Sequence, residues 1–204
     1  TQRGHRGQDV FFADDDRRAY MSYLRDYSER YALDVLAYCL MTNHVHLVVL
    51  PREPDSLALT LRSAHMRYSQ MINARFGWTG HLWQGRYFSV ALDEPHLWAA
   101  VRYVERNPVR ARVVREARDY KWSSAGFHLG LRTDRLVRSS TEWGSSVEDW
   151  SSALAAEQDQ ETIDLLRSRT QSGFPCGDEA FVRAISDRIG RPLLLRGRGR
   201  PRRA

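Results

Sequence analysis

The sequence predicts an α+β fold in which an antiparallel sheet is covered by helices. Two apolar segments, residues 33–41 and 44–50, are separated only by Thr42-Asn43, which is the pattern of a β-hairpin. Segments with helical spacing of apolar residues precede and follow this hairpin. A chain of 204 residues, 42% of them hydrophobic, is long enough for one domain with a sizeable core and a smaller appended unit.

Residues 1–7 are expected to form the end of a strand or a glycine-rich turn. The printed chain starts without an initiator methionine, so we expect its first strand to be truncated. A helix should follow from Asp14 to about Tyr31, because three aspartates stabilise its N-terminus. Its aromatic residues recur at helical spacing and predict a core-facing side rather than a binding surface.

A second helix is expected from Ser56, as N-cap, to about Phe76, followed by Gly77. Polar residues on its other side, His65 among them, are expected to face solvent. A third helix should start near Glu94-Pro95 and end near Asn107, because Pro108 disfavours helical geometry in the residue before it.

Residues 78–88, between these two helices, mix glycines and aromatic residues with Gln84 and Arg86. Such a mixture suits stacking on unpaired bases and contact with phosphate, so Gln84 and Arg86 are candidate DNA-binding residues. An aromatic plug under the sheet explains the same pattern equally well. A strand is expected at residues 89–92, and the order hairpin, helix, strand, helix predicts a ferredoxin-like sandwich if the N-terminus adds a strand.

The composition changes after Val114, so we expect a domain at residues 1–114 and a helical appendage at 115–190. Helix starts with serine caps are expected at residues 120–125 and 148–153, and a last helix near 177–189. Residues 191–204 form an arginine-rich tail with six arginines and no acidic residue, which equals the formal net charge of +6. A basic arm on a balanced body favours a nucleic-acid partner over a merely solubilising tail.

No run of about 18 apolar residues is present, which excludes a transmembrane helix, and no apolar signal sequence is visible at the start. The two cysteines, Cys39 and Cys176, lie far apart and show no metal-binding spacing. They predict reduced thiols and a cytoplasmic location.

The predicted strand at residues 44–50 carries His44 and His46, whose side chains point to the same face because strand residues alternate. Two neighbouring imidazoles backed by an apolar face can bind one divalent metal ion. With an amide oxygen from Asn107, such a metal would polarise a phosphate. Tyr103, one helical turn before Asn107, could then attack this phosphate as a covalent nucleophile. The covalent phosphotyrosine would conserve the energy of the broken phosphodiester bond, so no nucleotide cofactor would be needed.

The strand Thr-Asn-His-Val-His-Leu-Val-Val at residues 42–49 and the segment Tyr-Val-Glu-Arg-Asn-Pro-Val-Arg-Ala at 103–111 resemble the two signature motifs of HUH single-tyrosine transposases. The closest resemblance is to the REP-associated tyrosine transposases. Further similarity lies in residues 10–12, 81–87 and 122–124, and the resemblance covers about residues 1–130. Two motifs in this order and spacing are far more specific than the isolated His-Val-His.

This resemblance implies the HUH fold and a role for each motif residue. His44 and His46 would bind Mg²⁺ or Mn²⁺, and Asn107 stands where relatives place a third polar ligand. Tyr103 would attack a single-stranded DNA phosphate, leaving a 5′-phosphotyrosine and a free 3′-hydroxyl. The implied substrates are imperfect hairpins of extragenic palindromic repeats with a short adjacent guide sequence, and both a monomer and a homodimer agree with the pattern.

Two other classes of function remain open from the residues. One is a non-catalytic DNA-binding protein with the same fold, and the other is a metal-dependent hydrolase in which Tyr103 is structural. In the tail, Arg198-Gly199-Arg200-Pro201-Arg202 resembles an AT-hook core, which would bind the minor groove of A·T-rich DNA. As a simple phosphate-binding arm, Arg198, Arg200 and Arg202 would still make DNA affinity salt-dependent.

Overall fold

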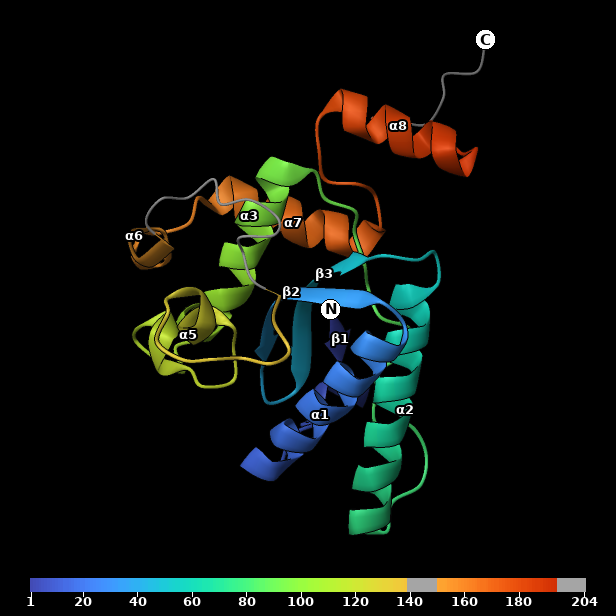
Figure 1. Ribbon diagram of the computed structural model, residues 1–204, viewed down its shortest axis with the longest axis vertical. Coiled ribbons are helices and arrows are strands. Elements are labelled where there is room, and N and C mark those ends of the chain that lie inside the picture. Colours follow the sequence, from blue (N-terminus) through green and yellow to red (C-terminus); the bar gives the residue numbers. More distant parts are fainter. Residues whose placement is uncertain (139–149, 194–204) are drawn as a thin grey trace.

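The computed structural model describes residues 1–138 and 150–193, and its centre is a three-stranded antiparallel sheet (Figure 1). The strands are β1 (Gln2–Arg3), β2 (Leu33–Leu40) and β3 (His44–Pro51), in the order β1-β3-β2. β2 and β3 form the predicted hairpin, in which Leu40 pairs with Val45 beside the turn. The predicted α+β fold with an antiparallel sheet is therefore confirmed.

Two long helices, α1 (Asp14–Arg30) and α2 (Ser56–Phe76), cover one face of the sheet (Figure 1). α1 begins where predicted, and the Asp16 carboxylate accepts hydrogen bonds from the backbone N–H groups of Phe12 and Ala13. Large apolar and aromatic side chains fill the space between these helices and the sheet: Phe11, Tyr20, Leu24, Val45, Leu61, Tyr68, Ile72 and Trp83.

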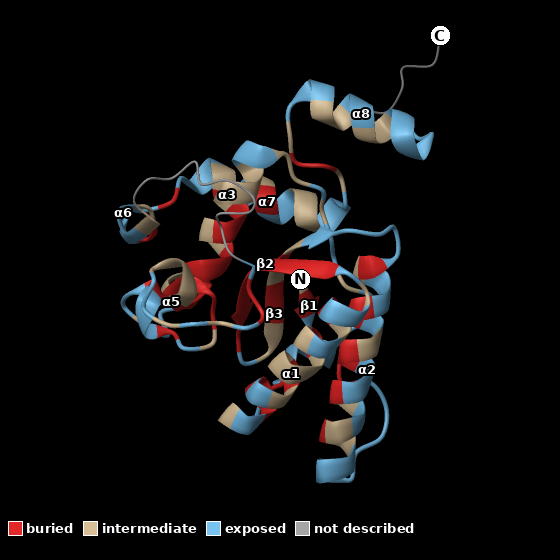
Figure 2. Ribbon diagram, in the orientation of Figure 1, coloured by how far each residue is buried: buried red, intermediate tan, exposed pale blue. Residues whose placement is uncertain are grey.

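The opposite face is covered by α3 (Glu94–Glu105) and α7 (Gln160–Ser172). A second apolar cluster lies here, formed mainly by β2, β3 and α3: Leu36, Ala37, Cys39, Val48, Ala100, Val101, Val104 and Leu166. β2 is buried along its whole length because it is packed on both faces (Figure 2).

Shorter elements complete the described chain: η1 (His5–Gly7), α4 (Asn107–Arg110), η2 (Ala117–Asp119), α5 (Ala125–His128), α6 (Trp150–Ala155) and α8 (Glu179–Ile189). α6 is held to α3 by two arginines, since Arg102 and Arg106 donate to the carbonyl oxygens of Ala156 and Leu154. α8 projects from the body and has no buried residue (Figures 1 and 2). No helix in the described ranges is long and apolar enough to cross a membrane.

Several details differ from the sequence-based expectations. The strand predicted at residues 89–92 does not join the sheet, because Leu92 forms an isolated bridge with Cys176 instead. α7 was not predicted. Ser124 precedes α5 but makes no capping hydrogen bond, because its hydroxyl donates to Glu105. The third helix ends at Glu105, and α4 then continues through Asn107 and Pro108.

Candidate active site

The two histidines of β3 lie on the sheet face that α3 covers. Val45, between them, is 1% exposed and belongs to the core under α1 and α2, so the strand alternates as predicted. The imidazole rings of His44 and His46 have their centroids 4.9 Å apart in an edge-to-face arrangement. His46 is buried and His44 is half-buried, so the pair lies at the rim of the second core.

Each imidazole uses its Nδ1 atom for a hydrogen bond to a neighbouring side chain. His44 Nδ1 lies 2.6 Å from Asn43 Oδ1, and His46 Nδ1 lies 2.8 Å from Thr1 Oγ1. In the described part of the chain no hydrogen bond involves either Nε2 atom. Histidines that bind a metal through one ring nitrogen commonly hydrogen-bond through the other, so this arrangement suits two metal ligands.

Burial keeps both rings neutral at physiological pH. It lowers the pKa of His44 to about 4, with a further contribution from the positive charge of Arg3. It also lowers the pKa of His46 well below its usual range, with the neighbouring His44 as the next cause. Neutral imidazole is the form that binds a metal ion.

Tyr103 lies on α3 directly beside the histidine pair. Its ring centroid is 5.8 Å from that of His46, again edge to face. The side chain is half-buried at the margin of the core, which leaves it within reach of a ligand. The structure thus brings together His44, His46 and Tyr103, which lie far apart in the sequence.

Arg110 is a residue of this site that the sequence analysis did not single out. Its guanidinium carbon lies 4.0 Å from the centroid of the Tyr103 ring, and its Nη2 donates to the Tyr103 carbonyl oxygen at 2.7 Å. Tyr103 and Arg110 are seven residues apart, which is two helical turns, and this spacing is the signal that could have revealed the pair.

Asn107 begins α4, one turn beyond Tyr103, and is 9% exposed. Its Nδ2 atom is buried without a hydrogen-bond partner in the described residues. No group of three or more His, Cys, Asp or Glu side chains in the described ranges is placed to hold a metal ion. A complete ligand set would therefore combine the two imidazoles with oxygen ligands such as the Asn107 amide, and this third ligand stays a prediction.

The loop with Gln84 and Arg86 lies along β1. The backbone N–H of Gln84 donates to Arg3, that of Phe88 donates to Thr1, and Gly4 forms a bridge with Trp83. Leu82 and Trp83 are buried in the core, whereas Gln84 and Arg86 are exposed. The expected aromatic plug is therefore observed at Leu82 and Trp83, whereas DNA binding by the exposed Gln84 and Arg86 stays a prediction. Arg198, Arg200 and Arg202 lie outside the described residues.

A buried polar network fixes the C-terminal end of α3. Glu105 is 0% exposed, and its carboxylate accepts hydrogen bonds from Ser124 Oγ at 2.5 Å and from Trp150 Nε1 at 2.9 Å. His128 Nδ1 lies 2.6 Å from the same carboxylate. Sequence reasoning missed this network because its members come from three separate segments.

A family model described as IS200-like transposase matches residues 6–107, the region that contains the histidines, Tyr103 and Asn107. The chain belongs to this family. The resemblance to the REP-associated tyrosine transposases is also confirmed: a Haemophilus influenzae protein of that name is 24% identical over 149 residues, which are 62% of this chain and 82% of the relative.

The fold has a solved counterpart in a REP-associated tyrosine transposase bound to a REP hairpin. The two chains superimpose with a TM-score of 0.53 and share 17% sequence identity over 78% of this chain and 88% of the other. Because the sequence identity is low, the superposition establishes only that the IS200-like transposase described here shares its fold with that protein.

Proposed function

We propose that this transposase cleaves and rejoins single-stranded DNA next to hairpins through a covalent 5′-phosphotyrosine intermediate. The observation that supports it most directly is the position of Tyr103 beside His46, with 5.8 Å between the ring centroids. A phosphate placed between the histidines and α3 would lie close to the Tyr103 hydroxyl, which is the nucleophile. It would also lie close to the imidazole nitrogens of His44 and His46, which are the two metal ligands.

In this proposal the Tyr103 hydroxyl oxygen attacks the phosphorus, and the bond from phosphorus to the 3′ oxygen breaks. The proton lost by the tyrosine ends on the departing 3′-hydroxyl, and the strand stays joined to the enzyme through its 5′-phosphate. The reverse attack by a 3′-hydroxyl releases the tyrosine and seals a strand. Because each step exchanges one phosphodiester for another, no nucleotide cofactor is needed.

His44 and His46 are the residues that would hold Mg²⁺ or Mn²⁺, with the Asn107 amide oxygen as a third ligand. When bound, the ion would polarise the phosphate and stabilise the negative charge that develops on it. Arg110 adds a positive charge 4.0 Å from the tyrosine ring, which favours negative charge on the phenolic oxygen during attack.

The proposed substrates are hairpins of the REP type, and a structural relative is bound to such a hairpin. Gln84 and Arg86 are exposed beside β1 and would contact the DNA there. Arg198, Arg200 and Arg202 of the tail at residues 191–204 would add phosphate contacts that weaken with salt. Residues 1–114 would carry the chemistry, and residues 115–190 would support α3. The protein would act in the cytoplasm as a monomer or a homodimer.

The decisive experiment uses labelled single-stranded hairpins from the flanks of the gene, mixed with protein and Mn²⁺ or Mg²⁺. On a denaturing gel, the unmodified chain should give a slow covalent protein–DNA band. Tyr103→Phe should abolish this band, because phenylalanine has no oxygen to attack with, and should leave hairpin binding in a native gel unchanged. Tyr31→Phe, at the far end of α1, is the matched control and should retain the band.

Covalent capture by Tyr103→Phe would contradict the proposal. A native gel shift without cleavage of any hairpin would indicate a DNA-binding protein that has lost the chemistry. Metal-dependent cleavage that survives Tyr103→Phe and leaves no adduct would indicate a hydrolase.

A further inference from the structure

Asn43 is the last residue of the turn between β2 and β3 and directly precedes His44. Its side chain is half-buried and makes a hydrogen bond at each end of the amide. Nδ2 donates to the Gly7 carbonyl oxygen at 3.1 Å, and Oδ1 lies 2.6 Å from His44 Nδ1. The side chain therefore joins the η1 turn to the first of the two histidines, and no step of the proposed reaction uses it.

The N-terminal segment also holds the backbone of this turn in place. The backbone N–H of Gly4 donates to the Asn43 carbonyl oxygen at 2.8 Å. The N–H groups of Val10 and Phe11 both donate to the Thr42 carbonyl oxygen, at 3.0 and 3.1 Å. The chain between these contacts wraps around the turn, so the Asn43 side chain starts from a fixed backbone.

The bond to Gly7 fixes which way the Asn43 amide points. A backbone carbonyl oxygen can only accept a hydrogen bond, so the amide atom that faces it must be the NH₂ nitrogen. A reversed amide would place two acceptor oxygens against each other and would leave both unsatisfied. The oxygen of the amide therefore faces His44.

This orientation decides which ring nitrogen of His44 carries the proton. Asn43 Oδ1 can only accept, so His44 Nδ1 must be the donor and must carry a hydrogen. A neutral imidazole has one ring proton, so Nε2 keeps a free lone pair. A metal ion binds that lone pair, and the bond made by the other ring nitrogen sets which nitrogen is available.

His46 differs from His44 in this respect. Its Nδ1 lies 2.8 Å from the hydroxyl of Thr1, and a hydroxyl can donate as well as accept. The Thr1 hydroxyl therefore holds the ring in position without choosing its tautomer. Of the two histidines, His44 is the one whose metal-binding form is prescribed by its neighbour.

We propose that Asn43 is a positioning residue of the metal site, which keeps the proton of His44 on Nδ1 and thereby presents Nε2 to the ion. This inference rests on the proposed function for the presence of the ion. Groups that hydrogen-bond to metal-ligating histidines fix the tautomer and the ring orientation, and their loss typically weakens metal binding about 10- to 100-fold. Asn43 acts through His44 and touches neither the reacting phosphate nor the nucleophile.

The proton on His44 can be located directly in the metal-free protein. In the full chain with isotope-labelled histidine, in EDTA, the NMR chemical shifts of the ring nitrogens distinguish a protonated nitrogen from a bare one. The His44 signals are those that disappear in His44→Gln. We expect a protonated Nδ1 and a bare Nε2 in the unmodified chain, and a population with the proton on Nε2 in Asn43→Ala.

Titration of the same proteins with Mn²⁺, without DNA, measures the consequence. Asn43→Ala should weaken Mn²⁺ binding about 10- to 100-fold. Asn43→Asp keeps an acceptor oxygen opposite His44 Nδ1 but loses the donor to Gly7, so it should keep the proton on Nδ1 and bind Mn²⁺ at least as tightly as the unmodified chain. If Asn43 only supported the turn, both variants should weaken binding alike.

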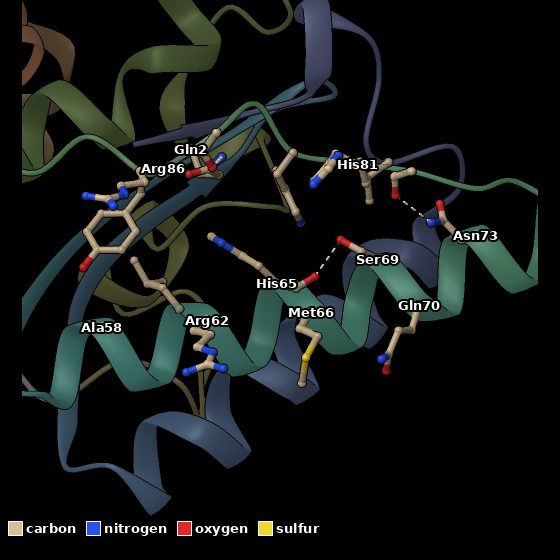
Figure 3. Close-up of a pocket in the computed structure, with 16 residues that line it drawn as sticks. Gln2, Ala58, Arg62, His65, Met66, Ser69, Gln70, Asn73, His81 and Arg86 are labelled. Atoms are coloured by element: carbon tan, nitrogen blue, oxygen red, sulfur yellow. Dashed lines mark hydrogen bonds between the residues drawn. The ribbon is translucent and has the colours of Figure 1, made fainter.

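The matched control is Asn73→Ala in α2, which covers the other face of the sheet. Asn73 also donates from Nδ2 to a backbone carbonyl oxygen, that of Gly80 at 3.0 Å (Figure 3). Its replacement removes the same kind of bond away from the histidines. It should leave both the proton on His44 and the affinity for Mn²⁺ unchanged.

The inference is overturned if Nδ1 of His44 is bare in the unmodified chain, or if this chain binds no Mn²⁺. It is also overturned if Asn43→Ala changes neither the proton position nor the Mn²⁺ affinity, or if Asn43→Asp binds Mn²⁺ as weakly as Asn43→Ala.

These results are distinguishable from failure of the proposed strand transfer, because neither measurement requires DNA or cleavage. A missing covalent band together with the expected effects of Asn43→Ala would reject the strand transfer and support the positioning role. A covalent band in the unmodified chain, with Asn43→Ala binding Mn²⁺ as the unmodified chain does, would support the strand transfer and reject the positioning role.

Discussion

The two faces of the central sheet differ in how many of their buried polar atoms have hydrogen-bond partners. Under α1 and α2, aromatic rings pack edge to face and most buried polar atoms have partners, such as the Tyr68 hydroxyl, which donates to the Val10 carbonyl oxygen at 2.5 Å. Under α3, several buried polar atoms lack a partner within the described ranges. They are concentrated between residues 102 and 110: Arg102 Nε, Arg106 Nε, Asn107 Nδ2 and Arg110 Nη1.

Unpaired buried polar groups destabilise a fold. Arg102 and Arg106 use their other nitrogens to hold α6, whereas Arg110 packs on the Tyr103 ring, so only part of this set lies beside the proposed nucleophile. The α1/α2 face stabilises the protein and gives the α3 face a rigid support. Outside the α3 face, Ser28 Oγ and Trp83 Nε1 are also buried without a hydrogen-bond partner in the described residues.

The largest expected loss of stability comes from a cavity under α1 and α2. Ile72 is 0% exposed in α2, and Ile72→Ala should lower the free energy of unfolding by about 2–5 kcal/mol, as measured by urea denaturation. The folded fraction should still form the covalent DNA adduct, because the cavity lies on the supporting face. Loss of the adduct in fully folded Ile72→Ala would show that the two faces are not independent.

A smaller loss should follow when the buried network on α3 is disturbed. Glu105→Gln replaces one acceptor oxygen with an NH₂ group that faces donors from Ser124, His128 and Trp150. We expect the free energy of unfolding to fall by about 1–3 kcal/mol, the range for an unsatisfied buried group. We also expect slower adduct formation with unchanged hairpin affinity, because α3 positions the tyrosine.

The matched control for this change is Glu179→Gln on α8. Glu179 forms an exposed ion pair with Arg183, and its loss should change the free energy of unfolding by less than about 0.5 kcal/mol. If both glutamate variants lowered the stability equally, the network would not be the support of α3.

The last effect is confined to acidic pH and concerns His65, which is hydrogen-bonded to Tyr20 on the α1/α2 face. Burial lowers the pKa of His65 to about 3, from 6.5 for an exposed histidine. The unfolded chain therefore binds the proton more readily, and the stability due to neutral His65 is complete above pH 6.5 and lost as the pH falls toward 3. His65→Gln should flatten the fall in unfolding free energy below pH 6.5 by at most about 1.4 kcal/mol per pH unit.

Urea denaturation at a series of pH values would measure this slope. His5→Gln changes an exposed histidine of η1 and should leave the slope as it is in the unmodified chain. An unaltered slope in His65→Gln would mean that His65 is not held neutral by its surroundings.

The sequence by itself determined the hairpin, the three main helices and the residues of the His strand, because these depend on local periodicity and on helix and turn signals. It also determined which face of β3 carries the histidines, since side chains alternate along any strand. The helix that carries Tyr103 was predicted with its end displaced by two residues from Glu105.

Only the tertiary structure decided what meets across the fold. The contacts of Tyr103 with His46 and of Glu105 with Trp150 join positions separated by 57 and 45 residues, and no local pattern encodes such pairings. Residues 89–92 illustrate the same limit: their local preference is extended, but their partner is Cys176 rather than the sheet. His65 was expected to face solvent because it follows a polar pattern on α2, yet it is buried, since its ring packs against Trp83 and its Nε2 is hydrogen-bonded to Tyr20. Local sequence determines elements and the faces that side chains occupy, whereas long-range packing determines which of those faces form a site.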